Sequence, residues 1–444
     1  MHPLISRWSD EDFWRKLCPH LSISTNGDGD SCTSTSNVQP KYYEQKERQE
    51  LLDRLIDDGY ALLDEPCNDG LKEKVGKAIS NLELQHSIPA TFALLFNETW
   101  QLAAESKQLL LQKQNEGILQ SHGKMRFNFD MLAWHIDPRR KQVGFSPHRD
   151  RQPDTLDALK QSFYSDGQAK YITHWIALAD ANPNNSCLYV IPKQFDPGYL
   201  EGDDPPESST DESKTDSENN TESSSSDSGS FSDPLSRALP TKQSYQNIRA
   251  LPRKEGESII FTHRILHWGS AGNPRASKLH PRVAISFVYS DVDYEAPYLT
   301  NFSMDDDKLP PFSLRLLLVC SQLLIYYQRF DNLTTQHLRA CYEYCKQHAD
   351  ELNDAYRKKV FVEFVKAMKE RRDGVEDDGD DDKAALVKDK EGSRNDNDGD
   401  DSDDEEAMLE AMLENSDQFD DDFDDEYYDS DDCGKHKSKR ARIG

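Results

Sequence analysis

Three side chains in two distant segments could bind one metal ion together. His148 and Asp150 are two residues apart, so on a strand their imidazole and carboxylate would project from the same face. His267 lies much further along the chain, in a segment that also contains His263. Two histidines and one carboxylate form a facial triad, which holds a non-haem Fe(II) ion and leaves positions open for a bidentate co-substrate and O₂.

Each of these residues also has an ordinary structural explanation. A histidine two residues before an aspartate is frequent by chance, as a surface histidine beside a loop carboxylate. Arg282 opens an apolar run 15 residues after His267. Inside a barrel its guanidinium can pair in bidentate fashion with a carboxylate, whereas outside it would be an exposed charge at the start of a strand. Only the combination of all four residues favours a functional site.

Short apolar runs separated by turns would position these residues. The runs cover residues 60–63, 124–131, 171–179, 187–191, 258–261 and 283–289. The run 124–131 alternates strictly between apolar and polar residues, which predicts a strand with one apolar face. Several short strands of this kind are typical of a sandwich or barrel rather than of a parallel α/β sheet.

Helical periodicity flanks the predicted strands. A short helix is expected after Asp10, and longer helical patterns cover residues 41–58, 90–113 and 312–371. The most apolar stretch, 314–327, contains an arginine and is shorter than the roughly 20 residues that a bilayer requires. This stretch therefore predicts a buried helix, and no membrane partner is expected.

The acidity of the chain is concentrated in two tracts. The 444 residues carry a formal net charge of −29. Residues 201–234 contribute −10 and residues 373–444 contribute −20, so the remaining 338 residues are almost neutral at +1. Like-charge tracts cannot bury enough apolar surface to offset the entropy of ordering, so both are expected to be disordered. The balanced remainder gives no sign of a dominant nucleic-acid-binding face.

These patterns predict four regions. A short helix and a polar linker occupy 1–40, and a β domain occupies 41–300 with a disordered acidic insert at 201–245. A helical extension follows at 301–372, and then a disordered acidic tail at 373–444. The tail ends in a basic cluster, 435–442, that resembles a nuclear-localisation signal.

The cysteine pattern favours a reducing compartment. The eight cysteines include no CxxC pair, and the first ten residues lack the apolar run of a signal peptide. We therefore expect free thiols and an intracellular location, cytoplasmic or nuclear.

As a set, several motifs resemble the phytanoyl-CoA dioxygenase family of Fe(II)/2-oxoglutarate oxygenases. They are His148-Arg149-Asp150, Trp175-Ile176-Ala177-Leu178-Ala179-Asp180, Asn184-Asn185-Ser186-Cys187-Leu188-Tyr189-Val190-Ile191-Pro192, the segment from Gly256 to Ser270, Asn273 and Arg282. Their order and spacing agree with the family pattern once the insert is discounted, over roughly residues 45–292. The sequence departs from the pattern at Ser186, at Lys193-Gln194-Phe195 and at Trp268.

The resemblance implies a fold, a ligand set and a co-substrate site. The fold is a double-stranded β-helix, the cupin-like jelly roll, which makes the chain mainly β with flanking helices. His148, Asp150 and His267 would hold Fe(II), and His267 rather than His263 matches the ligand because it precedes Trp268-Gly269-Ser270. The implied contacts of 2-oxoglutarate are Arg282 at its far carboxylate and, more weakly, Trp175, Ser270 and Met131.

The implied activity is a hydroxylation that releases succinate and CO₂, with a small-molecule or acyl substrate and with ascorbate as a candidate auxiliary. The alternative is a non-catalytic or weakly catalytic protein whose acidic tail binds basic partners such as histones. A third hypothesis is a protein or nucleic-acid hydroxylase or demethylase from the same superfamily, although the neutral core disfavours nucleic acid.

Overall fold

The computed structural model describes residues 2–24, 41–64, 67–119, 125–152, 155–203, 234–276, 280–304, 308–330 and 333–377. The chain forms two compact units, Met1–Val360 and Phe361–Gly444. In the second unit the described residues are the later turns of helix α11 (Asp354–Asp377). The expected boundaries at 40/41 and 300/301 therefore fall inside the first unit, and the acidic tail from residue 378 lies outside the described residues.

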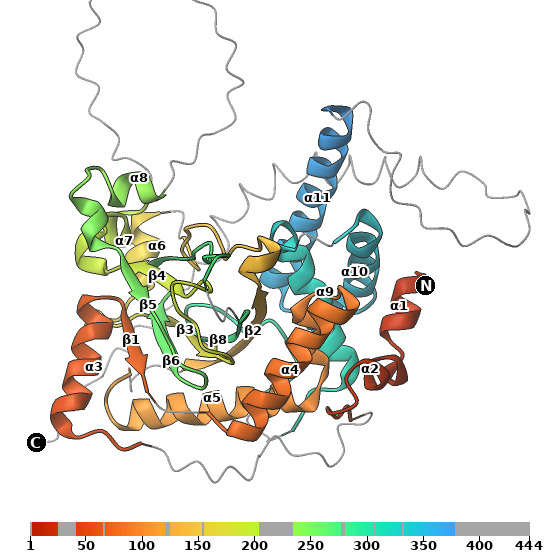
Figure 1. Ribbon diagram of the computed structural model, residues 1–444, viewed down its shortest axis with the longest axis horizontal. Helices are drawn as coiled ribbons and strands as arrows, with labels where there is room; N and C mark the ends of the chain where they lie inside the picture. Colours follow the sequence, from red (N-terminus) through yellow and green to blue (C-terminus); the bar gives the residue numbers. More distant parts are fainter. Residues whose placement is uncertain are drawn as a thin grey trace, which may run out of the picture. The chain divides into compact units, whose positions relative to one another are not determined.

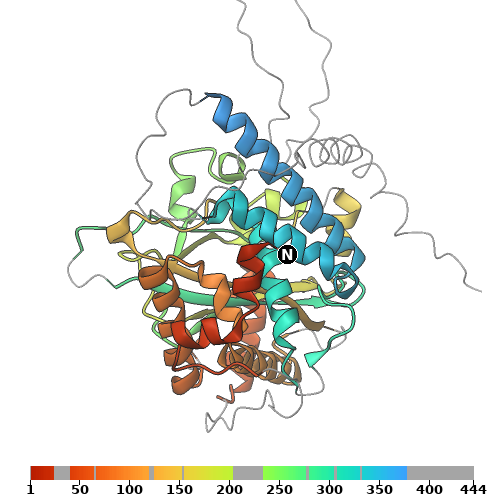
Figure 2. The same cartoon turned by 90° about the vertical axis from the view of Figure 1, so that its right-hand side faces the viewer.

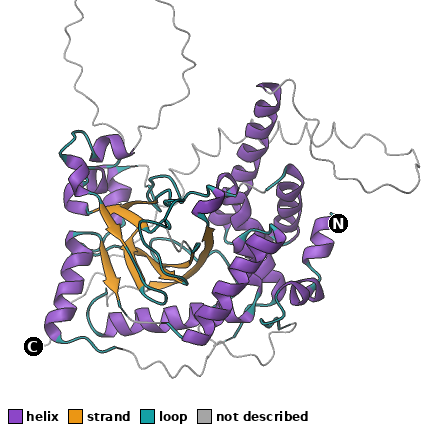
Figure 3. Cartoon of the chain, viewed as in Figure 1, coloured by secondary structure: helices purple, strands orange, loops and turns teal. Residues whose placement is uncertain are grey.

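Eight strands, counted over the described residues, form two antiparallel sheets (Figures 1 and 3). The larger sheet has the order β1 (Tyr60–Leu63), β6 (Ser258–Thr262), β3 (Tyr171–Ala177), β8 (Arg282–Asp291) and β2 (Met125–Ile136). The smaller sheet has the order β5 (Arg249–Leu251), β4 (Leu188–Ile191) and β7 (Leu266–Gly269). The prediction of antiparallel sheets with flanking helices is confirmed, but β5 and β7 are too short to show a period in the sequence.

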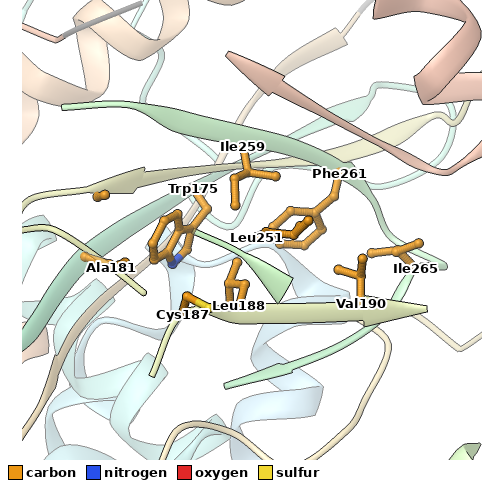
Figure 4. Close-up of a cluster of buried hydrophobic side chains, with 11 residues drawn as sticks. Trp175, Ala181, Cys187, Leu188, Val190, Leu251, Ile259, Phe261 and Ile265 are labelled. Carbon is orange, nitrogen blue, oxygen red and sulfur yellow. The ribbon is translucent and has the colours of Figure 1, made fainter. Parts of the chain in front are cut away.

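An apolar cluster fills the space between the two sheets. Figure 4 shows Trp175, Ile259 and Phe261 of the larger sheet near Leu188 and Val190 of the smaller one. The strand register explains the side of the larger sheet, because Trp175 on β3 is paired with Ile259 on β6 and paired residues project from the same face. Burying side chains of this size contributes roughly 1.5–3 kcal/mol each.

The opposite face of the larger sheet is covered by helices. The hydroxyl of Ser106, on α5 (Asn97–Asn115), lies 2.7 Å from Nδ1 of His174 on β3 and 2.8 Å from the hydroxyl of Tyr289 on β8. Helix α4 (Asp69–His86) packs on α5 and on β2 and β8 (Figure 1). These contacts fix which face of the sheet looks toward the smaller sheet.

The N-terminal and later helices of the first unit also pack together. Helix α1 (Pro3–Trp8) lies beside α10 (Thr335–Gln347), with the rings of Trp8 and His337 stacked at 5.8 Å (Figure 2). The other helices are α2 (Glu11–Leu17), α3 (Gln45–Asp57), η1 (Ala90–Leu95), η2 (Pro138–Arg140), α6 (Leu156–Gln161), η3 (Lys193–Phe195), α7 (Gly198–Glu201), α8 (Pro234–Ala238), η4 (Ser244–Asn247), α9 (Phe312–Ile325), η6 (Tyr327–Arg329) and η7 (Ala349–Glu351). Together they surround the two sheets and bring the two ends of the unit into contact.

The apolar stretch 314–327 forms most of the buried helix α9, as predicted. Arg315 is tolerated inside it because its guanidinium donates to the carbonyls of Pro310 and Leu95 and to Oδ1 of Asn97. None of the described helices combines the length and the apolar composition needed to cross a bilayer.

The strand predicted at 124–131 is present, but the expectation that only its apolar face would be buried is wrong. Strand β2 begins at Met125, and its pairing with β8 shifts between Phe127 and Met131, where Phe129 adopts a positive φ of 70°. A bulge of this kind leaves residues unpaired and lets both faces become buried. Residues 127–131 are accordingly all buried, the polar Asn128 and Asp130 included.

The expected disorder of the insert 201–245 is wrong for its described part, whereas residues 204–233 lie outside the described residues. Helix α8 lies inside that range, and Ala238 and Leu239 are buried against Ile191 and Leu266. Arg237 donates to the carbonyl of Gly202, so the two sides of the insert are held together. This small apolar contact was not predicted, because the acidic composition of 201–234 dominates the sequence just before it.

His174 and His263 should make the fold sensitive to acid. Burial lowers the pKa of each imidazole to about 3, whereas an unfolded histidine titrates near 6.5. Below pH 6.5 the unfolded chain therefore binds protons that the folded chain does not, and the free energy of unfolding falls as the pH falls. We expect each histidine to account for a loss of about 2 kcal/mol between pH 7 and pH 5, measured by urea denaturation.

A variant can isolate one of these contributions. His174→Gln should lose less stability between the two pH values than the wild type, by about 2 kcal/mol, because it has one buried imidazole fewer. His280→Gln, at an exposed position, is the matched control and should behave like the wild type. An unchanged pH dependence in His174→Gln would contradict this explanation.

Candidate metal centre

His148, Asp150 and His267 converge at one point of the cavity between the sheets. Each offers one ligand atom, and these atoms lie within 4.8 Å of one another. Oδ1 of Asp150 is 3.9 Å from Nε2 of His148 and 3.6 Å from Nε2 of His267. Two imidazoles and one carboxylate on one side of a cavity match the donor set of a non-haem iron site.

The backbone sets the distance between the two histidines. His148 and His267 form an antiparallel bridge in which each amide donates to the carbonyl of the other, at 3.0 and 3.1 Å. The amide of Gly269 also donates to the carbonyl of Phe145, so the segment 143–148 runs along β7 beside the smaller sheet. This approach requires Gly144, because a Cβ there would lie 2.4 Å from Cα of Gly269.

Both imidazoles are oriented by a carbonyl of their own segment. Nδ1 of His148 lies 2.7 Å from the carbonyl oxygen of Ser146, and Nδ1 of His267 lies 3.1 Å from that of Ile265. A carbonyl only accepts, so each Nδ1 carries the proton and each Nε2 keeps its lone pair toward the cavity. Desolvation, and then the neighbouring His267 and Arg329, hold the pKa of His148 well below its usual value, which keeps the ring neutral.

Asp150 connects this cluster to the larger sheet. The hydroxyl of Thr173 on β3 donates to Oδ2 of Asp150 at 2.5 Å, and Oδ1 is left facing the two histidines. A carboxylate with one oxygen hydrogen-bonded and the other free is oriented for a metal ion. His267 therefore comes from the smaller sheet, His148 and Asp150 come from the segment beside it, and the bond from Thr173 ties Asp150 to the larger sheet.

Arg282 lies in the same cavity with an unsatisfied charge. Its side chain is buried at the start of β8, and Nε and Nη1 have no hydrogen-bond partner among the described residues. Burial lowers its pKa to about 10, and its guanidinium carbon lies 6.0 Å from the ring centroid of Trp175. An unpaired buried guanidinium is costly unless a ligand satisfies it, and a dicarboxylate has the matching geometry.

Arg149, between the two ligands of the first segment, has a positioning role that the sequence did not reveal. Its guanidinium pairs with the buried carboxylates of Asp196 and Asp203 and donates to the carbonyl of Arg264. Arg264 in turn donates to the carbonyl of Gly198. These bonds hold the segment that carries His148 and Asp150 against the segments of Asp196, Asp203 and Arg264.

Of the other residues expected at the site, one lines the cavity and two do not. Trp175 lines the cavity, but Met131 and Ser270 are not among its lining residues. Leu132 and Trp134 of the same strand line it instead, because Met131 is paired with Phe287 on the opposite face of the sheet.

His263 lies away from the ligand cluster. Its Nε2 is 2.9 Å from the hydroxyl of Ser162, and its ring packs between Phe163 and Tyr171. It is buried and does not belong to the group of converging donors.

Several cavity residues carry no motif and were not found from the sequence. Asp130 is buried, with Oδ2 accepting from the hydroxyls of Tyr298 and Tyr326 and with Oδ1 unpartnered among the described residues. Desolvation raises the pKa of this carboxyl above its usual value. Arg151 pairs through two nitrogens with Glu295 and lies 3.7 Å from Asp130. The only feature of the sequence that pointed to Asp130 was that a polar residue lies within a predicted strand.

Comparison with known proteins finds only distant similarity, and only to solved structures. No protein-family model matches the chain, and no curated protein matches its sequence. Among solved structures, the epimerase SnoN in complex with Fe3+, α-ketoglutarate and nogalamycin RO is 17% identical with a TM-score of 0.36, over 56% of this chain and 86% of SnoN. EctD from S. alaskensis with 2-oxoglutarate and 5-hydroxyectoine gives 14% and 0.33, over 63% of this chain and 89% of EctD.

HygX from Streptomyces hygroscopicus with iron bound is 11% identical with a TM-score of 0.34, over 58% of this chain and 90% of HygX. At these identities and TM-scores, neither the activities nor the substrates of the three proteins carry over to this chain.

Gly144→Ala should damage the ligand cluster through the backbone. The added Cβ would overlap Gly269 and separate the segment 143–148 from β7, which would move His148 away from His267. We expect at least a tenfold loss of Mn(II) affinity by calorimetric titration, and roughly 1–3 kcal/mol of lost stability. Gly70→Ala, whose Cβ would meet nothing closer than 3.4 Å, is the control and should leave the affinity unchanged. Equal affinities in the two variants would count against the backbone argument.

Thr173→Val should weaken metal binding while keeping the shape of the side chain. It removes the hydrogen bond that orients Asp150, and such a loss costs about 10- to 100-fold in metal affinity. Thr91→Val is the matched control, because the Thr91 hydroxyl is buried without a partner among the described residues. Titration of Mn(II) into both proteins compares them, and a normal affinity in Thr173→Val would show that the bond is dispensable.

Proposed function

We propose that this chain is an Fe(II)/2-oxoglutarate-dependent oxygenase on a double-stranded β-helix, similar to the phytanoyl-CoA dioxygenase family. The reaction hydroxylates a small-molecule or acyl substrate and releases succinate and CO₂. The observation that carries the proposal is the joint presence, in one cavity, of the converging donors His148, Asp150 and His267 and of the unpaired guanidinium of Arg282.

The donor set and the buried charge fit the two absent groups. Two imidazoles whose Nε2 atoms face the cavity and a carboxylate suit Fe(II), and the unsatisfied nitrogens of Arg282 suit the far carboxylate of 2-oxoglutarate. A bound Fe(II) ion would supply the oxidative chemistry, the decarboxylation of 2-oxoglutarate coupled to substrate oxidation. Ascorbate as an auxiliary stays a prediction.

The residues of the chain would bind, orient and exclude water. Thr173 keeps the carboxylate of Asp150 turned toward the ion, and the carbonyls of Ser146 and Ile265 keep both histidines in one tautomer. Trp175 forms an aromatic wall beside Arg282, which keeps water from the charge and so strengthens its pairing with an anion. These roles require only small movements, because each group is already held by the fold.

The alternative of an acidic interaction protein rests on the tail, which lies outside the described residues. No feature among the described residues favours it. The cavity also weighs against it. A buried unpaired arginine lowers stability, and a protein that acts only through its tail would not need one.

The direct test is succinate formation. The full-length protein should release succinate from 2-oxoglutarate with Fe(II) and O₂, slowly without substrate and faster with one. His148→Ala and Asp150→Ala should lose at least 100-fold of this rate because they remove ligands. Arg282→Gln should raise the KM for 2-oxoglutarate by about tenfold or more, because it removes a charge-assisted pair.

The exposed His280→Gln supplies the control and should retain full activity. Metal binding by Mn(II) titration, measured beside the rate, separates a lost ligand from a misfolded protein. Unchanged metal affinity in both alanine variants would remove the site assignment.

A further inference from the structure

Four arginines line the cavity that contains the candidate ligands: Arg149, Arg151, Arg282 and Arg329. Arg149 is neutralised by Asp196 and Asp203, and Arg151 by Glu295. Arg282 is matched by the co-substrate if the proposed function holds. The Arg329 side chain has no ion pair or hydrogen bond with a described residue, and the carboxyl groups of Asp130 and Asp150 act on it only at longer range.

The position of Arg329 is set by aromatic rings rather than by an acid. Its guanidinium carbon lies 3.9 Å from the ring centroid of Phe145 and 4.9 Å from that of Tyr326. Flat contacts of this kind hold a guanidinium in place but leave its N–H groups at the edge unsatisfied. The side chain is partly buried, and desolvation lowers its pKa below the usual value.

Arg329 also marks the junction of two cavities. A second cavity, here called the outer groove, shares Trp134, Phe145 and Arg329 with the first one. The other charged residues that line it are Arg140, Lys141 and Glu83. Arg140 and Lys141 are exposed and cationic, whereas a carboxylate oxygen of Glu83 already accepts from the amide of Ala90 at 2.9 Å. The outer groove is therefore positive on balance.

The strand register places the outer groove beside the Arg282 end of β8, because Ile136 of the groove is paired with Arg282 and Trp134, which lines both cavities, is paired with Ala284. Arg282 and Ser286 are at the beginning and middle of β8, and Val288, paired with Thr173, is at the level of Asp150. A co-substrate bound to Arg282 would lie along this part of β8. Tyr326 and Arg329 reach the same cavity from the segment after α9 rather than from a strand.

We infer that the substrate of this oxygenase carries a carboxylate or phosphate group that binds Arg329, with the remainder of the molecule in the outer groove. This inference rests on the proposed function, which places the reacting carbon near the three ligands. Arg329 is then a substrate-binding residue, and a neutral substrate of the same shape is discriminated against.

The test measures binding of small probes to the full-length protein. The protein is saturated with Mn(II) and 2-oxoglutarate without O₂, so that the probe cannot occupy Arg282 and no turnover occurs. Hexanoate, hexyl phosphate and 1-hexanol are titrated calorimetrically, which separates a carboxylate from a phosphate preference. The proteins are the wild type, Arg329→Gln, Arg329→Lys and the control Arg54→Gln, whose arginine is exposed on α3.

The wild type should bind one of the two anions at least about tenfold more tightly than 1-hexanol. Arg329→Gln should abolish this preference while its affinity for 1-hexanol stays the same, and Arg329→Lys should restore part of it. Equal binding of anions and alcohol by the wild type overturns the inference. So does an anion affinity that survives in Arg329→Gln, or the absence of anion binding in the wild type.

The same titrations distinguish this inference from the proposed function. If Mn(II) and 2-oxoglutarate do not bind to the wild type, the oxygenase assignment fails, and the anions are titrated without them. Normal Mn(II) and 2-oxoglutarate affinity in Arg329→Gln, together with a lost anion preference, supports the inference and excludes misfolding as the cause.

Discussion

The candidate site depends on one antiparallel backbone bridge, between His148 and His267. Two amide–carbonyl bonds fix the distance between residues that are 119 positions apart in the chain. The bridge forms only because Gly144 and Gly269 let two backbones approach more closely than any side chain would permit. The carbonyls of Ser146 and Ile265 and the hydroxyl of Thr173 then orient the side chains that this contact brings together.

Buried charge is the second constraint on the site. The buried arginines differ in how far carboxylates neutralise them. Arg149 is fully compensated by two carboxylates, and removing its guanidinium would leave two buried carboxylates without their counter-charge. Arg282 has no such compensation, and the fold bears the desolvation cost of its guanidinium. A native protein retains a buried, unsatisfied cation where function demands it. The paired Arg149 is therefore expected to support the site, whereas the unsatisfied Arg282 is expected to bind a ligand.

The candidate metal ligands could be predicted from the sequence, whereas the residues that position them could not. His148, Asp150 and His267 stand in short motifs, and the apolar runs that became β1, β3, β4, β6 and β8 were visible because burial imposes a local pattern. Thr173 and Asp203 have no local signal, since their importance arises from partners 23 and 54 residues away. Met131 was misplaced relative to the cavity because the bulge in β2 and the pairing with β8, not the sequence alone, decide which residues face it.

The links from the ligand cluster to both sheets have a thermodynamic consequence. His267 belongs to the smaller sheet and His148 to the segment bridged to it, whereas Asp150 is fastened to the larger sheet through Thr173. An ion held by all three would act as a cross-link, and its binding free energy would oppose separation of the sheets. The folded chain would then be more stable with the metal than without it.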